Sequence, residues 1–119
     1  MADLLKMKCV PCESDIPPLT ESEIEIYQKD VPEWGVMDDT QGVPRLTRTF
    51  KFKNFAEALA FTDAVGAAAE DAGHHPLIEL TWGRATVQWW THNINGLHQN
   101  DFIMAARTDL IYSTKNKTE

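Results

Sequence analysis

Apolar side chains recur at helical spacing in three stretches of the chain. The first stretch follows Thr20, a good N-cap, and Glu23 comes three residues later to complete a capping box. The second stretch opens at Asn54, and Gly73 is a natural stop for it. We therefore predict helices over residues 20–30, 54–73 and 99–112.

Between these helices, apolar and polar side chains alternate, which is typical of half-buried strands. The second predicted strand shows the alternation best, with Leu46, Phe50 and Phe52 on one face. Arg48 shares this apolar face, so we expect it to lie near the edge or to find a partner. The predicted strands cover residues 34–37, 45–53, 77–82 and 84–90, the last two joined tightly around Gly83.

The order of elements is helix, strand, strand, helix, strand, strand, helix. Two hairpins separated by a long helix predict an α+β two-layer fold, in which three helices pack on one face of a four-stranded antiparallel sheet. A chain of 119 residues suggests a single domain. We place this domain at residues 19–119, after an irregular N-terminal arm at residues 1–18.

Charge and hydropathy exclude several classes of partner. The formal net charge is −7, which makes the chain a poor candidate for binding nucleic acid, because that function needs a basic face. No window approaches the run of about 18 apolar residues that a membrane span needs. The N-terminus also lacks an apolar core long enough for a secretory signal. We therefore expect a cytoplasmic protein with no membrane partner and no direct nucleic-acid partner.

The two cysteines, Cys9 and Cys12, form a C-x-x-C pair. Half of a zinc site or a redox pair would use this spacing. A structural zinc site usually has four ligands, and no second pair completes it. A redox pair should follow a strand and open a helix, whereas residues 13–18 have the composition of a loop. Two exposed thiols on a terminal segment are the favoured interpretation.

All four histidines, His74, His75, His92 and His98, fall in the second half of the chain. The first two precede Pro76, which favours an extended backbone, so their rings should point to opposite sides. If the last two strands pair as a hairpin, His74, His75 and His92 come to the same end of the sheet. Histidine is the side chain best suited to move protons near neutral pH. A general acid–base site and ordinary exposed loop histidines are both open interpretations.

The carboxylates and tryptophans near these histidines are more ambiguous. Asp101 is most simply a cap of the last helix, but it could also orient a histidine. Glu70 is either a solvated helix residue or an acceptor for a histidine ring N–H. We rank a core or interface position ahead of stacking on a flat heterocycle for each tryptophan of the last hairpin: Trp82, Trp89 and Trp90.

The spacing of these residues resembles that of pterin-4a-carbinolamine dehydratases. An acidic residue is followed after three residues by His-His-Pro; an aromatic residue follows after five, a histidine after nine more and an aspartate after eight more. The resemblance covers roughly residues 19–112. One departure is His98, where a Ser or Thr cap would be expected, and we expect its replacement to be nearly silent. The matching residues are Glu70, His74, His75, Pro76, Trp82, His92 and Asp101.

The resemblance implies a reaction, the elimination of water from 4a-hydroxytetrahydrobiopterin to give the quinonoid dihydropterin. This step recycles the cofactor of aromatic amino-acid hydroxylases, which are the implied protein partners. His74, His75 and His92 are the implied catalytic residues: His74 and His92 are the acid and base candidates, and His75 mainly binds and orients the pterin. Glu70 and Asp101 support the histidines, and Trp82 and Pro76 belong to the implied substrate site. No metal or cofactor is implied, because the pterin is the substrate.

Two alternative functions remain open, and the fold also raises an expectation about assembly. Relatives of this family also serve as a dimerisation partner of a transcription factor, so a non-enzymatic interaction role is the main alternative. A zinc hydrolase that uses His74, His92 and Asp101 is the second alternative, although the close helical spacings of such sites are missing. We also expect a homodimer or homotetramer, because the predicted fold leaves a sheet edge and apolar surface to cover.

Overall fold

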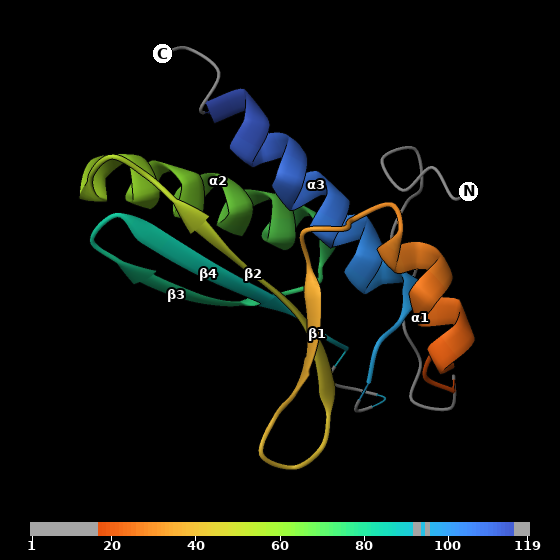
Figure 1. The fold of residues 1–119 in the computed structure, drawn as a ribbon. Helices are drawn as coiled ribbons and strands as arrows, with labels where there is room; N and C mark the ends of the chain where they lie inside the picture. The colour runs from red at the N-terminus through yellow and green to blue at the C-terminus, as the bar shows by residue number, and fades with distance from the viewer. Residues whose placement is uncertain (1–16, 92–93, 95, 116–119) are drawn as a thin grey trace.

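The computed structural model describes residues 17–91, 94 and 96–115, and the predicted α+β fold and order of elements are confirmed. Cys9, Cys12 and His92 lie outside the described residues. Two helices, α2 and α3, cover one face of the sheet, and α1 lies beside α3 (Figure 1). The elements are α1 (Glu21–Gln28), β1 (Gly35–Asp38), β2 (Pro44–Lys51), α2 (Phe55–Ala72), β3 (Leu77–Thr81), β4 (Arg84–Trp89) and α3 (Gln99–Lys115).

The four strands form one antiparallel sheet in the order β1-β2-β4-β3. In the last hairpin, Leu77 at the start of β3 pairs with Gln88 near the end of β4. This pairing confirms the predicted hairpin, and it places the turn before β3 beside the segment that follows β4. The sheet therefore brings the end of α2 and the start of α3 to the same edge of the molecule.

The helix ends form where the capping signals predict them. Thr20 and Glu23 make both hydrogen bonds of the capping box at the start of α1. The Asn54 side chain accepts a hydrogen bond from the Glu57 N–H, at 2.8 Å, at the start of α2. Gly73 ends α2 in the left-handed region, with φ of 69°, a conformation that glycine adopts without steric cost. The chain then turns directly into His74.

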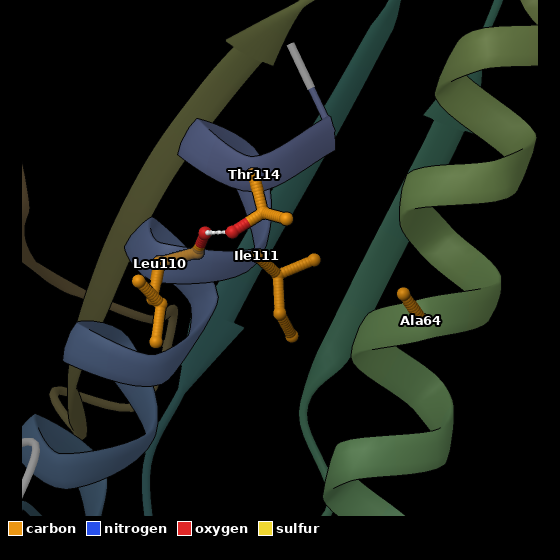
Figure 2. Close-up of a pocket in the computed structure, with 4 residues that line it drawn as sticks. All are labelled: Ala64, Leu110, Ile111 and Thr114. Carbon is orange, nitrogen blue, oxygen red and sulfur yellow. Dashed lines mark hydrogen bonds between the residues drawn. The ribbon is translucent and has the colours of Figure 1, made fainter. Parts of the chain in front are cut away.

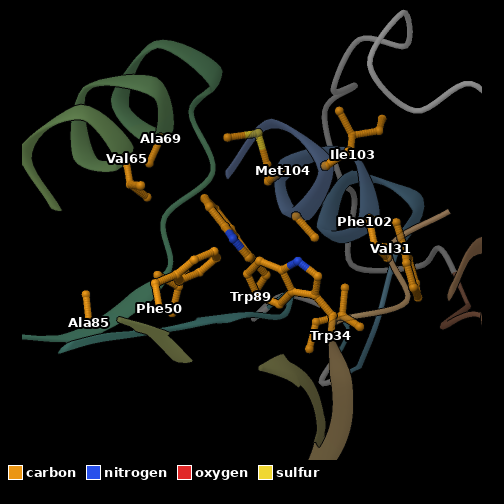
Figure 3. Close-up of a cluster of buried hydrophobic side chains, with 14 of the residues drawn as sticks. Val31, Trp34, Phe50, Val65, Ala69, Ala85, Trp89, Phe102, Ile103 and Met104 are labelled. Atoms are coloured by element: carbon orange, nitrogen blue, oxygen red, sulfur yellow. The ribbon is translucent and has the colours of Figure 1, made fainter. Parts of the chain in front are cut away.

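The core lies between the sheet and the helices (Figure 3). Trp89 of β4 and Phe50 of β2 point into it from the sheet, and Phe61 and Val65 point into it from α2. The capping segment of α3 is anchored in the same core through Leu97, which is fully buried. The largest fully buried side chains are Trp34, Trp89, Phe50, Phe61, Phe102, Leu46, Leu97, Ile103 and Met104.

Two further contacts involve Tyr27 of α1 and Arg48 of β2. The Tyr27 ring of α1 stacks on Phe102 of α3, with centroids 5.4 Å apart. Arg48, which the sequence places on an apolar face, has the predicted partner: its guanidinium donates to Asp109 at 2.6 Å and lies over the Phe50 ring. Within the described part of the chain, no helix has both the length and the apolar character needed to cross a membrane.

Candidate functional site

The candidate site lies where the end of α2, the end of β4 and the start of α3 meet. Just after β4, the Thr91 N–H donates to the Gly96 carbonyl at 2.9 Å, which returns the chain to the start of α3. Gly96 fits there because it lacks a side chain: a Cβ at this position would lie 2.9 Å from the Pro18 Cβ. The close contact fixes the segment before α3 against the chain that enters α1.

Asp101, in the first turn of α3, is the centre of this site. Its side chain is fully buried. One carboxylate oxygen, Oδ1, lies 2.6 Å from His74 Nε2. The other, Oδ2, accepts from the Thr91 hydroxyl at 2.9 Å and from the His98 backbone N–H at 2.8 Å. Three donors suit a carboxylate that has lost its proton, because an ionised carboxylate only accepts hydrogen bonds. Asp101 therefore caps the helix and orients a histidine at the same time.

The contact with Asp101 assigns the tautomer of His74. With Nε2 donating to the carboxylate, the other ring nitrogen, Nδ1, carries no proton in the neutral ring. The ring is stacked on the buried Trp89 indole, with centroids 5.6 Å apart and planes 20° from parallel. Trp89 is itself held by a hydrogen bond from its Nε1 to the Thr108 hydroxyl. The Asp101 carboxylate and the fixed Trp89 ring together hold the His74 imidazole in one orientation.

His75 is placed differently from its neighbour, as the extended backbone predicts. The His75 side chain is 62% exposed, whereas that of His74 is 13% exposed. His75 Nε2 lies 2.9 Å from Glu70 Oε1, one turn back on α2, and that carboxylate is 82% exposed. A pair this exposed is screened by water and contributes little to stability. It leaves His75 available at the surface, beside the more buried His74.

His98 occupies the N-cap position of α3, in spite of its poor propensity for that position. Its Nδ1 accepts a hydrogen bond from the Asn100 backbone N–H at 3.0 Å. Burial lowers the pKa of His98 below its ordinary value; the Asp101 carboxylate raises it by less, and His74 adds a smaller lowering. Together with the bond from its N–H to Asp101, this contact forms a reciprocal cap. α3 begins at Gln99, where the sequence predicts its start.

The structure groups some of the predicted site residues and separates others. It brings together His74 and Asp101, and it pairs His75 with Glu70. Pro76 joins the histidines to β3 and is half-buried. Trp82 is not beside the histidines of its own chain: it follows β3, so the whole five-residue strand, roughly 16 Å, lies between them. Its indole is 69% exposed.

The sequence interpretation assigned no role to Thr91 or to Trp89 as a support for His74. A signal for both was present in the register of the last hairpin. Trp89 faces the core, so Thr91, two residues later, projects to the same side and toward the helix that carries Asp101. Strand alternation alone could therefore have added both residues to the site.

No metal centre is found in the part of the chain that the structure describes, where no three His, Cys, Asp or Glu side chains could hold an ion together. Two hollows of the surface lie elsewhere. One, of about 230 Å³, lies between α2 and α3 and is lined by Ala64, Leu110, Ile111 and Thr114 (Figure 2). The other, of about 500 Å³, lies between α1 and the first hairpin. Neither hollow is lined by a histidine.

Comparison with known proteins finds relatives that match nearly the whole chain. The family model described as pterin 4 alpha carbinolamine dehydratase matches residues 17–111. A protein of Microcystis aeruginosa, named provisionally as a pterin-4-alpha-carbinolamine dehydratase, is 52% identical over 98% of this chain and 99% of its own length. A protein of Marinobacter nauticus with the same provisional name is 53% identical over 94% of this chain and 100% of its own length.

Two solved structures are similar to the fold. One, of a Brucella melitensis protein described as a transcriptional coactivator/pterin dehydratase, has a TM-score of 0.72 and 33% identity, and covers 79% of this chain and 97% of its own. The other is a pterin dehydratase-like protein described as a RuBisCO assembly factor in the alpha-carboxysome. It has a TM-score of 0.58 and 26% identity, and covers 67% of this chain and 89% of its own.

Proposed function

The chain belongs to the pterin 4 alpha carbinolamine dehydratase family, and from this premise we propose that it is an enzyme that eliminates water from a 4a-hydroxytetrahydropterin. In this reaction the bond between carbon 4a and the hydroxyl oxygen breaks, and the oxygen leaves as water after it takes a proton. The adjacent ring N–H loses a proton, and its electron pair forms the new carbon–nitrogen double bond. The products are water and the quinonoid dihydropterin.

The single observation that carries this proposal is the buried pair of Asp101 and His74. Each proton transfer needs a group that can hold or release a proton near neutral pH, and an imidazole meets that need. Asp101 Oδ1, 2.6 Å from Nε2, stabilises the imidazolium when Nδ1 is protonated and fixes the direction in which Nδ1 points. His74 is therefore proposed as one of the two groups that exchange protons with the pterin.

The other roles follow from the family motif. His92 is the proposed second acid or base. His75 binds and orients the pterin, and the Glu70 carboxylate at 2.9 Å limits the rotation of its ring. Neither proton transfer calls for a cofactor, so the proposal includes none. The pterin would come from an aromatic amino-acid hydroxylase, which regenerates the 4a-hydroxy compound at each turnover.

We also propose that the chain acts as a homodimer or homotetramer. β3 is an edge strand of the sheet, and the last hairpin exposes Leu77 and Trp82, which are 39% and 69% exposed. Unpaired strand edges and exposed apolar side chains are surfaces that a second copy can cover. Sedimentation of the purified chain as a monomer at micromolar concentration would contradict this assembly.

The experiment that tests the function is a dehydration assay on freshly generated 4a-hydroxytetrahydropterin. His74→Ala and His92→Ala should each lower turnover by about 10²–10⁴-fold while the pterin still binds, because each change removes one general acid or base. The double variant should lose less than the product of the two single losses if the two groups act as a unit. His75→Ala should mainly raise KM.

Circular dichroism of each variant controls for folding. Turnover near the wild-type value in the folded double variant would exclude histidine acid–base catalysis. A binding role, which the described function of the alpha-carboxysome relative illustrates for a similar fold, would then be the better proposal.

A further inference from the structure

His98 makes the two contacts of a reciprocal cap, as Thr20 does at the start of α1, but with an imidazole nitrogen as the acceptor. Its side chain accepts the Asn100 N–H through Nδ1, and its backbone N–H donates to Asp101 Oδ2. Ser, Thr, Asp and Asn are the strongly preferred N-caps, and their oxygens accept at every pH near neutrality. An imidazole nitrogen accepts only while it has no proton. This cap therefore depends on whether the His98 imidazole carries a second proton.

Protonation of His98 would reverse the contact with Asn100. Nδ1 would become a donor facing another N–H, and a positive charge would lie at the helix N-terminus, where the helix dipole is already positive. The charged groups that face His98 among the described residues are Asp101 on its own helix and His74 from the turn after α2. Burial and His74 favour the neutral ring, and Asp101 opposes them. At neutral pH the neutral, accepting ring is thus favoured.

The same cap holds the partner of His74. Asp101 lies in the first turn of α3, the turn that frays when a cap is lost, and one of its oxygens is bound by the His98 N–H. We propose that His98 is a positioning residue: its neutral ring caps α3 and holds the Asp101 carboxylate toward His74, so that protonation of His98 in acid uncouples Asp101 from His74. This inference rests on the proposed function, and it replaces the expectation that a change at His98 is nearly silent.

The test compares the full-length wild type with His98→Ser and His98→Thr, which supply a cap that does not titrate. Turnover of each protein is measured from pH 5.5 to pH 7.5 and divided by its own value at pH 7.5. At pH 5.5, the relative turnover of the wild type should be about fivefold lower than that of the two variants. Loss of one N-cap typically changes the helix-folding equilibrium by about this factor.

Two readouts do not depend on activity. The thermal midpoint of the wild type should fall more between pH 7.5 and pH 5.5 than that of His98→Ser, since a His with a lowered folded-state pKa destabilises the fold as pH falls below its unfolded value. The imidazole ¹⁵N shifts of His98 at pH 7.5 should show a proton on Nε2 and none on Nδ1. Asn54→Ser, which changes the cap of α2 from one non-titrating residue to another, is the matched control and should follow the wild-type pH dependence.

Superimposable pH curves of wild type and His98→Ser, in turnover and in thermal midpoint, would overturn the inference. A proton on His98 Nδ1 at pH 7.5 would overturn it too. If no protein dehydrates the pterin at any pH, the proposed function fails, and the thermal and NMR measurements still decide whether His98 is a pH-dependent cap.

Discussion

α3 carries two carboxylates that face the rest of the fold, Asp101 in its first turn and Asp109 just over two turns later. Asp101 is fully buried and is bound by His74, Thr91 and the His98 backbone. The Asp109 side chain is 27% exposed. It accepts from Trp34 Nε1 at 2.8 Å and from Arg48 at 2.6 Å. One helix therefore presents two aspartates that differ mainly in their partners.

The difference between the partners decides whether each aspartate belongs to a pair that can exchange a proton. An arginine keeps its proton at any pH that a protein meets, so the pair of Arg48 and Asp109 cannot exchange a proton. Burial raises the pKa of Asp109, while the Trp34 and Arg48 contacts lower it and Glu33 adds a small rise. A histidine exchanges its proton near neutral pH, so the pair of His74 and Asp101 can. The presence of a largely buried carboxylate does not by itself distinguish the Asp101 region from the Asp109 region.

The largest expected effect is that of Asp101→Asn. The amide would present an NH₂ group to one set of donors, His74 or Thr91 with His98, so at least one buried donor would lose its acceptor. We expect turnover to fall at least about 100-fold, because His74 would lose its orientation and the charge that stabilises its imidazolium. Steady-state kinetics with folding checked by circular dichroism would measure this. Turnover within about threefold of wild type would remove Asp101 from the mechanism.

This region also shows how far the sequence predicts the site. Extended backbone before Pro76, the hairpin register and the capping position of Asp101 are local signals, and together they predict that His74 and His75 point apart and that Asp101 lies near a histidine. Whether Asp101 binds His74 or His75 depends on how α3 packs across the sheet. That packing is a long-range property, because Asp101 lies 27 positions after His74 in the sequence, and no local pattern specifies it.

The second prediction concerns Asp109→Ala, which should affect stability and not chemistry. Removing the carboxylate leaves Arg48 and the Trp34 N–H without their acceptor in a largely buried place. We expect the free energy of unfolding to fall by about 3 kcal/mol, measured by urea denaturation. Turnover per folded molecule should remain within about threefold of wild type. A large loss of turnover at unchanged stability would reverse the contrast between the two aspartates.

Asp109→Asn is the matched control for this change. Its amide oxygen can still accept from Trp34, so it should cost less than the alanine variant. It also removes a titrating group whose folded-state pKa is raised. Such a group makes the wild type lose stability as pH rises from about 3.8 through the raised value, so this part of the pH dependence should disappear in Asp109→Asn.

The region around Asp109 is less predictable from the sequence than the region around Asp101. The sequence predicts that Arg48 lies near the edge of the apolar face or finds a partner, because a charged residue on an apolar strand face is costly. It does not identify that partner, which lies 61 residues away on α3. Likewise, the separation of Trp82 from the histidines follows from the length of β3, whereas the motif spacing alone groups it with them. Spacing along the chain can identify a family, but it does not give the distance between two residues in the folded protein.

The smallest expected effect is that of Glu70→Gln, which tests whether the proton exchange proposed for His74 depends on burial as well as on the pairing of a histidine with a carboxylate. Glu70 and His75 repeat the chemistry of Asp101 and His74 at the surface, where both side chains are more than half exposed. Water screens such a pair, so stability should change by less than about 0.5 kcal/mol. If Glu70 only restrains a histidine that binds the pterin, KM should rise by no more than about threefold and kcat should stay unchanged. Full kinetics of this variant beside Asp101→Asn give the comparison. A fall in kcat as large as that of Asp101→Asn would mean that the exposed pair, and not the buried one, exchanges protons with the substrate.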